Sequence, residues 1–145
     1  MTAVASLFAD APVISCYSRA QALADGVLVD AAHGDLAPVT AQHFVGLTPL
    51  PSVVIAPHLG AAMRAAVAAG ADLSGVWHDV LFLATAASGA AGNLGRAFYE
   101  SVTTLGPRRW SFVVRIGAAT ELVLCDIGPG DAGEPVVTFM LRADR

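Results

Sequence analysis

The sequence predicts one α+β domain over residues 1–145, in which an antiparallel sheet packs against two to four helices. Near the C-terminus, Trp110–Ile116 alternates apolar with polar residues, which is the pattern of a strand with one buried face. In the middle of the chain, Val76–Ala84 places apolar residues at the spacing of an amphipathic helix. The chain has 145 residues, which suits a single domain with a substantial core.

Three short elements are expected near the N-terminus. Val13–Tyr17 is rich in β-branched and aromatic residues and predicts a first strand, which we expect to join the C-terminal sheet. Ser18 is a favourable N-cap for a short helix over Arg19–Asp25, and Gly26 is a favourable residue to end that helix. Val27–Asp30 then predicts a second strand.

The middle of the chain predicts helices. Thr40 is a candidate cap for a short helix that runs to Gly46. Pro57–Ala69 begins with a proline and is followed by a glycine, as helices often are. A further helix is expected to reach about Ala87, with Asp72 or the serine two residues later as its cap.

The C-terminal third predicts a meander of antiparallel strands. Ser88–Gly95 is a glycine-rich loop, and Phe98–Thr104 is expected to be a strand, with a helix end as the alternative. Trp110–Ile116 and Thr120–Ile127 flank a short turn and predict a hairpin. Pro135–Leu141 predicts the last strand.

Residues 126–135, DIGPGDAGEP, are either a phosphate-binding loop or the turn between two strands. A phosphate loop leads into a helix, whose free N–H groups bind the anion, but here a strand-like run, VVTFML, follows. The three acids of the stretch would also repel phosphate. The stretch therefore predicts a hairpin turn, in which Gly130 and Gly133 supply positive φ angles and Asp131 holds an Asx turn.

Charge and hydropathy restrict the class of partner. All eight basic residues are arginine, and the net charge of −4 argues against direct nucleic-acid binding. No apolar stretch reaches the ~18–20 residues that a membrane span needs, so no membrane association is expected. The N-terminus lacks the basic region of a signal peptide, and we expect the protein to be cytoplasmic.

No motif for catalysis, metal binding or a cofactor is recognised. The four histidines follow no metal-ligand spacing, and no serine or cysteine lies in a nucleophile motif. Cys16 and Cys125 both lie in apolar runs, which favours buried thiols, with a disulfide between neighbouring strands as the alternative. The sequence therefore predicts no catalytic residue, no metal and no cofactor.

Two groups of polar residues are candidates for binding. Around the short N-terminal helix, Arg19 either pairs with Asp30 or Asp131 and fixes the helix to the sheet, or helps to form a recognition or anion-binding surface. A second group combines arginine with an aromatic ring, as partner-binding patches do. The candidate residues are Tyr17, Arg19, Gln21, Asp25, Asp30, Asp131 and Glu134 in the first group, and Arg108, Arg109 and Trp110 in the second.

Both ends of the chain resemble one family. Residues 17–30, YSRAQALADGVLVD, and residues 128–141, GPGDAGEPVVTFML, are similar to the start and finish of small uncharacterised proteins carried by phages, plasmids and other mobile elements. Residues 76–81, VWHDVL, resemble the middle motif of that family, a tryptophan and a DVL triplet on a helix. The chain departs from the family at its end, which reads MLRADR instead of MLP followed by acids. A contact made by an acidic tail is therefore not expected here.

The resemblance implies a biological setting. We expect a small non-enzymatic protein that binds a host protein, with inhibition of a defence system such as CRISPR or restriction as its role. One alternative is a nucleotide-binding domain or small enzyme that uses Arg19, Tyr17 and the acids of the closing hairpin. Another is a structural or oligomer-forming module, because the alanine-rich helix over residues 57–69 would allow close packing between subunits.

Overall fold

The computed structural model describes residues 18–89 and 93–145. Its centre is a five-stranded sheet with the strand order β1-β2-β5-β4-β3. The α+β class is confirmed, but the sheet is mixed, because β2 (Ser52–Ile55) runs parallel to β5 (Pro135–Leu141). The remaining neighbours, including β3 (Arg108–Ile116) and β4 (Ala119–Pro129), pair antiparallel. Within the described residues no helix is both long and apolar enough to cross a membrane.

The predicted elements at the start of the described chain are present. Ser18 and Gln21 form a capping box at α2 (Arg19–Ala24), and Gly26 follows the helix with a φ of 76°. The second strand is β1 (Val29–Asp30), which is shorter than the sequence indicated. The predicted strand Val13–Tyr17 lies outside the described residues.

Strand β2 was not predicted from the sequence. It contains four residues, SVVI, and three of them are buried. A run this short that is buried on both faces has no polar–apolar alternation by which a strand is recognised. Its pairing with β5 becomes visible only in the folded chain, since β5 lies more than 80 residues further along.

The structure differs from the sequence-based expectation at Phe98–Thr104 and at Thr40. Phe98–Thr104 is not the expected strand, and the alternative of a helix end is confirmed, because α6 (Leu94–Glu100) is continued by a π-helical segment η2 (Ser101–Leu105). Asn93 accepts a hydrogen bond from the N–H of Arg96 at the start of α6, and such a cap favours the helix.

Thr40 does not cap a helix. It lies inside α3 (Ala37–His43), which follows a 3-10 turn, η1 (Gly34–Leu36). Its buried hydroxyl lies 2.6 Å from the carbonyl oxygen of Ala31 and accepts a hydrogen bond from the indole N–H of Trp77. The hydroxyl therefore forms hydrogen bonds within the core and does not cap a helix.

The two long helices and the C-terminal hairpins agree with the sequence. Helix α4 (Pro57–Ala68) begins at the predicted proline, and α5 (Leu73–Ser88) is capped by Asp72, whose side chain accepts a hydrogen bond from the N–H of Gly75. Strands β3, β4 and β5 follow one another as the predicted meander.

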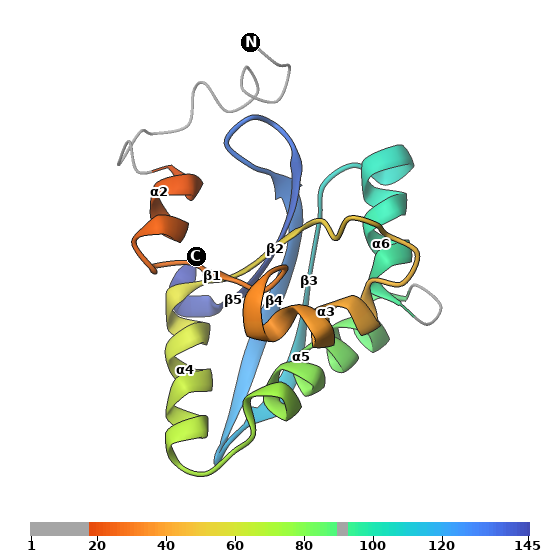
Figure 1. Cartoon of the computed structure of the whole chain (residues 1–145). Coiled ribbons are helices and arrows are strands. Elements are labelled where there is room, and N and C mark those ends of the chain that lie inside the picture. The colour runs from red at the N-terminus through yellow and green to blue at the C-terminus, as the bar shows by residue number, and fades with distance from the viewer. Residues whose placement is uncertain (1–17, 90–92) are drawn as a thin grey trace.

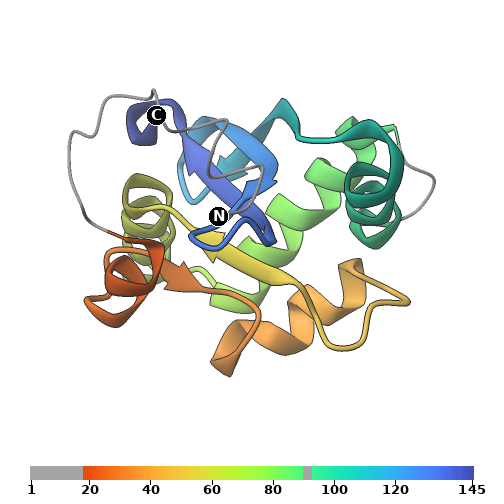
Figure 2. The same cartoon turned by 90° about the horizontal axis from the view of Figure 1, so that it is seen from above.

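The two faces of the sheet are covered differently. The main core lies on the face that packs against α3, α4, α5 and α6, and includes Trp77 and Phe139. The opposite face, here called the outer face, carries Leu124 and Met140, against which Leu28 packs. In Figure 1, α4 lies to the left of the strands, α5 to the lower right and α6 to the right. Helix α2 lies at the opposite end of the molecule from α6 in both views (Figure 1, Figure 2).

The C-terminus supplies the cap of α4. Ala56, at the N-cap position, has no polar side chain, and Pro57 has no N–H. Asp144, in the 3-10 turn η3 (Arg142–Asp144), accepts hydrogen bonds from the N–H groups of His58 (2.8 Å) and Leu59 (3.3 Å). The same carboxylate accepts from the N–H of Leu141 (2.9 Å) and lies 2.8 Å from the ring Nδ1 of His58.

These contacts depress the pKa of Asp144. Burial alone would raise the pKa of its carboxyl, but the hydrogen bonds from His58, Leu141 and Leu59 outweigh it and hold the pKa below its usual value. The ionised carboxylate therefore stabilises the folded chain.

Asp144→Asn should lower the free energy of unfolding at pH 7 by about 1–2 kcal/mol, since the charged cap is lost. The difference from the native protein should shrink as the pH falls below about 4, because the depressed pKa gives stability only while the native carboxyl is ionised. Urea unfolding at several pH values measures both effects. Asp79→Asn on the exposed side of α5 is the control. An equal loss in that control would contradict a capping role.

Candidate functional site

The predicted turn between β4 and β5 is confirmed. The strands pair up to Pro129 and Pro135, and the N–H of Gly130 donates to the carbonyl of Glu134 (2.7 Å). Gly133 has a φ of 82°, as expected of a turn glycine. Gly130 does not have a positive φ, so that part of the prediction was wrong. It is needed for space instead, because a Cβ there would lie 2.8 Å from Cγ2 of Val136.

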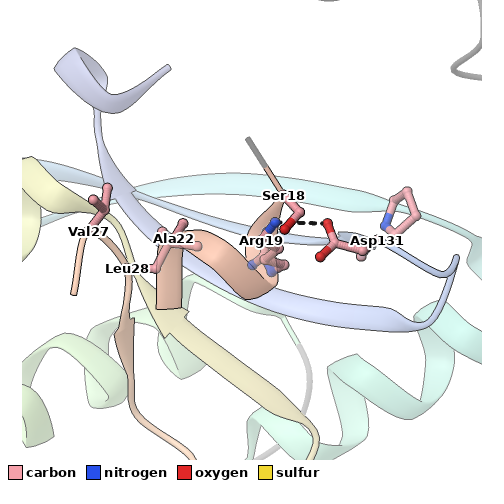
Figure 3. A pocket seen from close by; sticks show the side chains of 8 residues that line it. Ser18, Arg19, Ala22, Val27, Leu28 and Asp131 are labelled. Atoms are coloured by element: carbon pink, nitrogen blue, oxygen red, sulfur yellow. Dashed lines mark hydrogen bonds between the residues drawn. The ribbon is translucent and has the colours of Figure 1, made fainter. Parts of the chain in front are cut away.

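The acid at the tip of this turn caps a distant helix. Oδ1 of Asp131 accepts a hydrogen bond from the N–H of Arg19 (2.9 Å), and its Oδ2 accepts from the N–H of Ala20 (2.9 Å). Figure 3 shows the carboxylate beside the start of α2. Ser18 Oγ accepts from the next N–H, that of Gln21. We expected Asp131 to hold an Asx turn, but it serves another element.

This cap fills the place that an anion would take. The first three N–H groups of α2 already have partners, two on Asp131 and one on Ser18. A shallow pocket of about 390 Å³ lies beside them, and it is lined by Ser18, Arg19, Ala22, Val27, Leu28, Pro129, Gly130 and Asp131. Because a carboxylate forms part of its wall, the pocket is poorly suited to phosphate. The nucleotide alternative stays a prediction with no support from this geometry.

The guanidinium of Arg19 lies over the outer face of the sheet. Its Nη2 donates to the hydroxyl of Thr138 on β5, and its buried Nε has no hydrogen-bond partner among the described residues. Burial lowers the pKa of Arg19, and the nearby carboxylates of Asp131, Asp126 and Glu134 act in the opposite direction. Three carboxylates therefore lie close enough to Arg19 to stabilise its positive charge.

The expected pairing of Arg19 with Asp30 is not found. Asp30 accepts a hydrogen bond from the N–H of Ala32 (2.8 Å), and its other carboxylate oxygen lies 2.8 Å from Nδ1 of His33. Asp30 thus stabilises the chain after β1. Asp131, the other expected partner, contacts the backbone N–H of Arg19 and not its guanidinium.

A row of polar residues crosses the outer face and joins the two predicted groups. Nε of Arg109 on β3 donates to Asp126 on β4 (3.2 Å), and the two residues are opposite each other in the pairing. Asp126 is in turn opposite Thr138 on β5, which accepts from Arg19. We call Arg109, Asp126, Thr138 and Arg19 the polar row. Asp126 and Thr138 were not among the site residues predicted from the sequence. The pairing of Asp126 with Arg109 could have been predicted, because the two residues lie equally far from the turn at Gly117 along β4 and β3.

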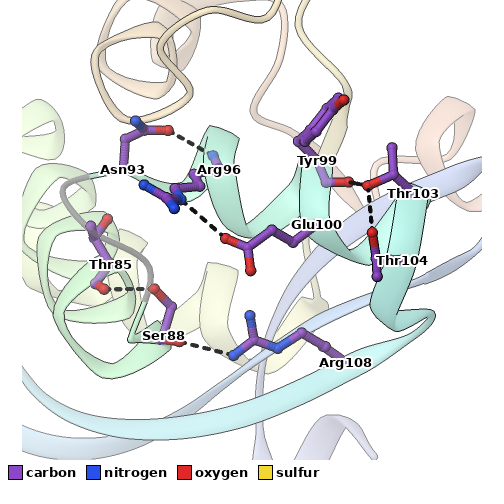
Figure 4. A network of polar contacts seen from close by, with 9 residues as sticks. All are labelled: Thr85, Ser88, Asn93, Arg96, Tyr99, Glu100, Thr103, Thr104 and Arg108. Atoms are coloured by element: carbon purple, nitrogen blue, oxygen red, sulfur yellow. Dashed lines mark hydrogen bonds and ion pairs between the residues drawn. The ribbon is translucent and has the colours of Figure 1, made fainter.

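Arg108 and Trp110 point to the opposite face and serve the fold. Nη2 of Arg108 donates to the carbonyl of Ser88 (2.9 Å), and the indole N–H of Trp110 donates to that of Ala84 (3.0 Å). The Arg108 guanidinium also lies 5.0 Å from the centroid of the Trp110 ring. Figure 4 shows Arg108 reaching the end of α5 from β3. These contacts satisfy carbonyl groups in the last turns of a helix, where a cation is favourable.

The other predicted site residues lie around α2 and the hairpin. Gln21 completes the capping box, and Asp25 is the C-terminal cap of α2. Glu134 accepts a hydrogen bond from the N–H of Ala132 within the turn (2.9 Å). Tyr17 and Cys16 lie outside the described residues. Cys125 is a buried thiol without a disulfide partner among the described residues, and burial raises its pKa.

A pair of histidines links α3 to α5. Nε2 of His43 lies 2.9 Å from Nδ1 of His78, so one ring donates a hydrogen bond to the other. His43 is buried, and this burial, together with the neighbouring His78, lowers its pKa. Among residues 18–89 and 93–145, no three metal-ligating side chains come together.

The alanine-rich face of α4 borders a second shallow hollow. Ala62, Ala65, Ala66 and Ala69 line it together with the turn over residues 116–119 and Glu121, and its volume is about 300 Å³. Small side chains allow close approach of another helix, but nothing at this hollow identifies an occupant. Homo-oligomer formation through α4 stays a prediction.

A family model for a family of unknown function, DUF6573, matches residues 4–145. The chain belongs to the DUF6573 family. No curated protein and no solved structure is detectably similar to it. The family match spans both the hairpin and α2, so the contact between Asp131 and the start of α2 joins two segments of one DUF6573 domain.

Asp131→Ala should loosen α2 without unfolding the sheet of this DUF6573 domain. The exchange of the amide hydrogens of Ala22 and Asp25 should accelerate about 5- to 30-fold, because a helix cap contributes about 1–2 kcal/mol. Hydrogen exchange followed by NMR measures this for each amide. Glu134→Gln is the matched control within the same turn. Unchanged exchange in α2 would contradict the capping role.

The stability of the domain should fall as the pH drops below about 6.5, since unfolded His43 binds a proton more readily than folded His43. Urea unfolding between pH 7.5 and 5.5, at about half-unit steps, tests this, and His43→Gln should flatten the dependence. His78→Gln should flatten it only in part, because burial is the larger cause of the lowered pKa. An unaltered slope in His43→Gln would contradict this assignment.

Proposed function

We propose that this DUF6573 chain is a non-enzymatic protein-binding module that docks its partner on the outer face of the β3–β4 hairpin. The surface consists of the exposed side chains Arg109, Ser111, Val113, Arg115 and Leu122, which we call the hairpin patch. It combines two arginines with two apolar side chains, a mixture typical of protein interfaces.

One observation carries this proposal. Val113 and Leu122 are directly opposite each other in the β3–β4 pairing, and both are exposed, at 57% and 37%. Further along the same face, Leu124 and Met140 are buried. Two adjacent apolar side chains left uncovered on a sheet face, between two arginines, have the chemistry of a docking site.

The positive charge of the hairpin patch is concentrated at Arg115. Arg109 forms an ion pair with Asp126, whereas Nε of Arg115 donates to the carbonyl of Gly117 (3.2 Å). Arg115 has no carboxylate partner among the described residues. A partner with acidic groups would therefore be attracted to this patch although the chain as a whole is acidic, with a net charge of −4.

The biological setting is part of the proposal. We infer that the chain acts in the cytoplasm as a factor of a mobile element and binds a host protein of a defence system such as CRISPR or restriction. The support is the resemblance of the two ends of the chain to proteins of such elements. Phage plating on a host with an active defence system tests this setting. Native protein should raise the plating efficiency, and Val113→Glu should not.

Leu122→Glu and Val113→Glu should each weaken partner binding about 30-fold or more, because a buried charge would replace an apolar contact at the centre of the patch. Affinity capture from host lysate with quantitative mass spectrometry measures the loss. Val67→Glu on α4 is a matched control, since Val67 is 37% exposed, as Leu122 is. Melting temperatures of all three variants check folding. Equal capture by the patch variants and the control would contradict the proposed surface.

A further inference from the structure

Strand β3 forms one edge of the sheet. It pairs with β4 along its whole length of nine residues, and no other described strand lies on its far side. Nine residues is long for an edge strand, because most strands have about five or six. The unpaired N–H and C=O groups of an edge strand are a template for another strand.

The outer-face side chains of β3 indicate which strand would fit. Arg109, Ser111, Val113 and Arg115 are all exposed, and they alternate with the buried side chains of the core face. The charged residues are at the two ends, and the small and apolar residues lie between them. A strand added here would face two positive charges separated by an uncharged centre.

A second copy of this chain is a poor occupant. Full antiparallel pairing of β3 with another β3 would place Arg109 opposite Arg115 twice. Parallel pairing in register would place each arginine opposite itself. Like charges directly opposite destabilise a strand pair, so the arginines disfavour self-association.

We propose that β3 accepts, as an additional strand, an extended acidic segment of a partner protein, with carboxylates opposite Arg109 and Arg115 and β-branched residues opposite Ser111 and Val113. Backbone hydrogen bonds along the free edge hold the segment, and the two charge pairs fix its position along β3. This inference rests on the proposed protein-binding function and specifies the chemistry of the partner.

Among the described residues, only one of the two arginines at the ends of β3 has a carboxylate partner. Helix α2 lies over β5, where Arg19 contacts Thr138, and β4 is covered at Asp126 by the ion pair with Arg109. Arg115, at the other end of β3, has no such partner among the described residues. The positive charge is therefore least compensated at the end of the strand next to the β3–β4 turn.

The test uses a synthetic extended peptide with glutamates opposite Arg109 and Arg115 and alternating threonine and valine between them. A peptide with lysines in place of the glutamates is the control. In the lysine peptide, two repulsions replace the two attractive charge pairs, and this should weaken its affinity for the chain about tenfold or more. The full-length chain should therefore bind the glutamate peptide at least about tenfold more tightly, as measured by NMR titration of the β3 amides.

Two further measurements distinguish strand addition from simple charge attraction. Arg115→Glu should abolish the preference, because each peptide then makes one attractive and one repulsive charge pair, and the double variant Arg109→Glu/Arg115→Glu should reverse it. N-methylation of the glutamate peptide at alternate backbone nitrogens should abolish binding, since it removes the hydrogen-bond donors. Arg64→Glu on α4 should leave the preference unchanged. Retained binding of the methylated peptide, or an unchanged preference in Arg115→Glu, would overturn the proposal.

Failure of the peptide test is separable from failure of the proposed function. If no peptide binds but Leu122→Glu still loses the captured partner, the hairpin patch binds a folded surface and the strand-addition inference is wrong. If capture is the same for Leu122→Glu and Val67→Glu, the proposed function itself fails.

Discussion

The position of two helices depends on carboxylates that flank one central strand. Asp131 precedes β5 and caps α2, and Asp144 follows β5 and caps α4. Asp131 is 112 positions from Arg19, from whose N–H it accepts a hydrogen bond, and Asp144 is 86 positions from His58. Because β5 lies between β2 and β4, these contacts place the N-terminal helices on a sheet that the C-terminal third completes.

This arrangement leaves one part of the sheet uncovered. Helix α2 is held over β5 by its cap and by the contact of Arg19 with Thr138, so the outer face is occupied at that end. Towards β3, no helix among the described residues is found over this face, and Val113 and Leu122 stay exposed. The same capping that stabilises α2 therefore covers one part of the outer face and leaves Val113 and Leu122 outside the covered part.

The candidate polar residues divide by the face on which each one lies. Arg108 and Trp110 point to the core face and satisfy carbonyl groups of α5, whereas Arg109 between them points to the outer face. Adjacent residues on a strand face opposite sides, so three neighbouring candidates have two different roles. Asp131, a candidate ligand-binding acid, acts as an internal anion for α2.

The sequence by itself determined the features that depend on neighbouring residues. The cap at Ser18, the start of α4 at Pro57 and the β3–β4–β5 meander all follow from local preferences and periodicity. Only the tertiary structure decided the parallel pairing of β2 with β5 and the polar row. These depend on contacts between distant residues, and no local pattern encodes which distant partner a carboxylate or a short apolar run will meet.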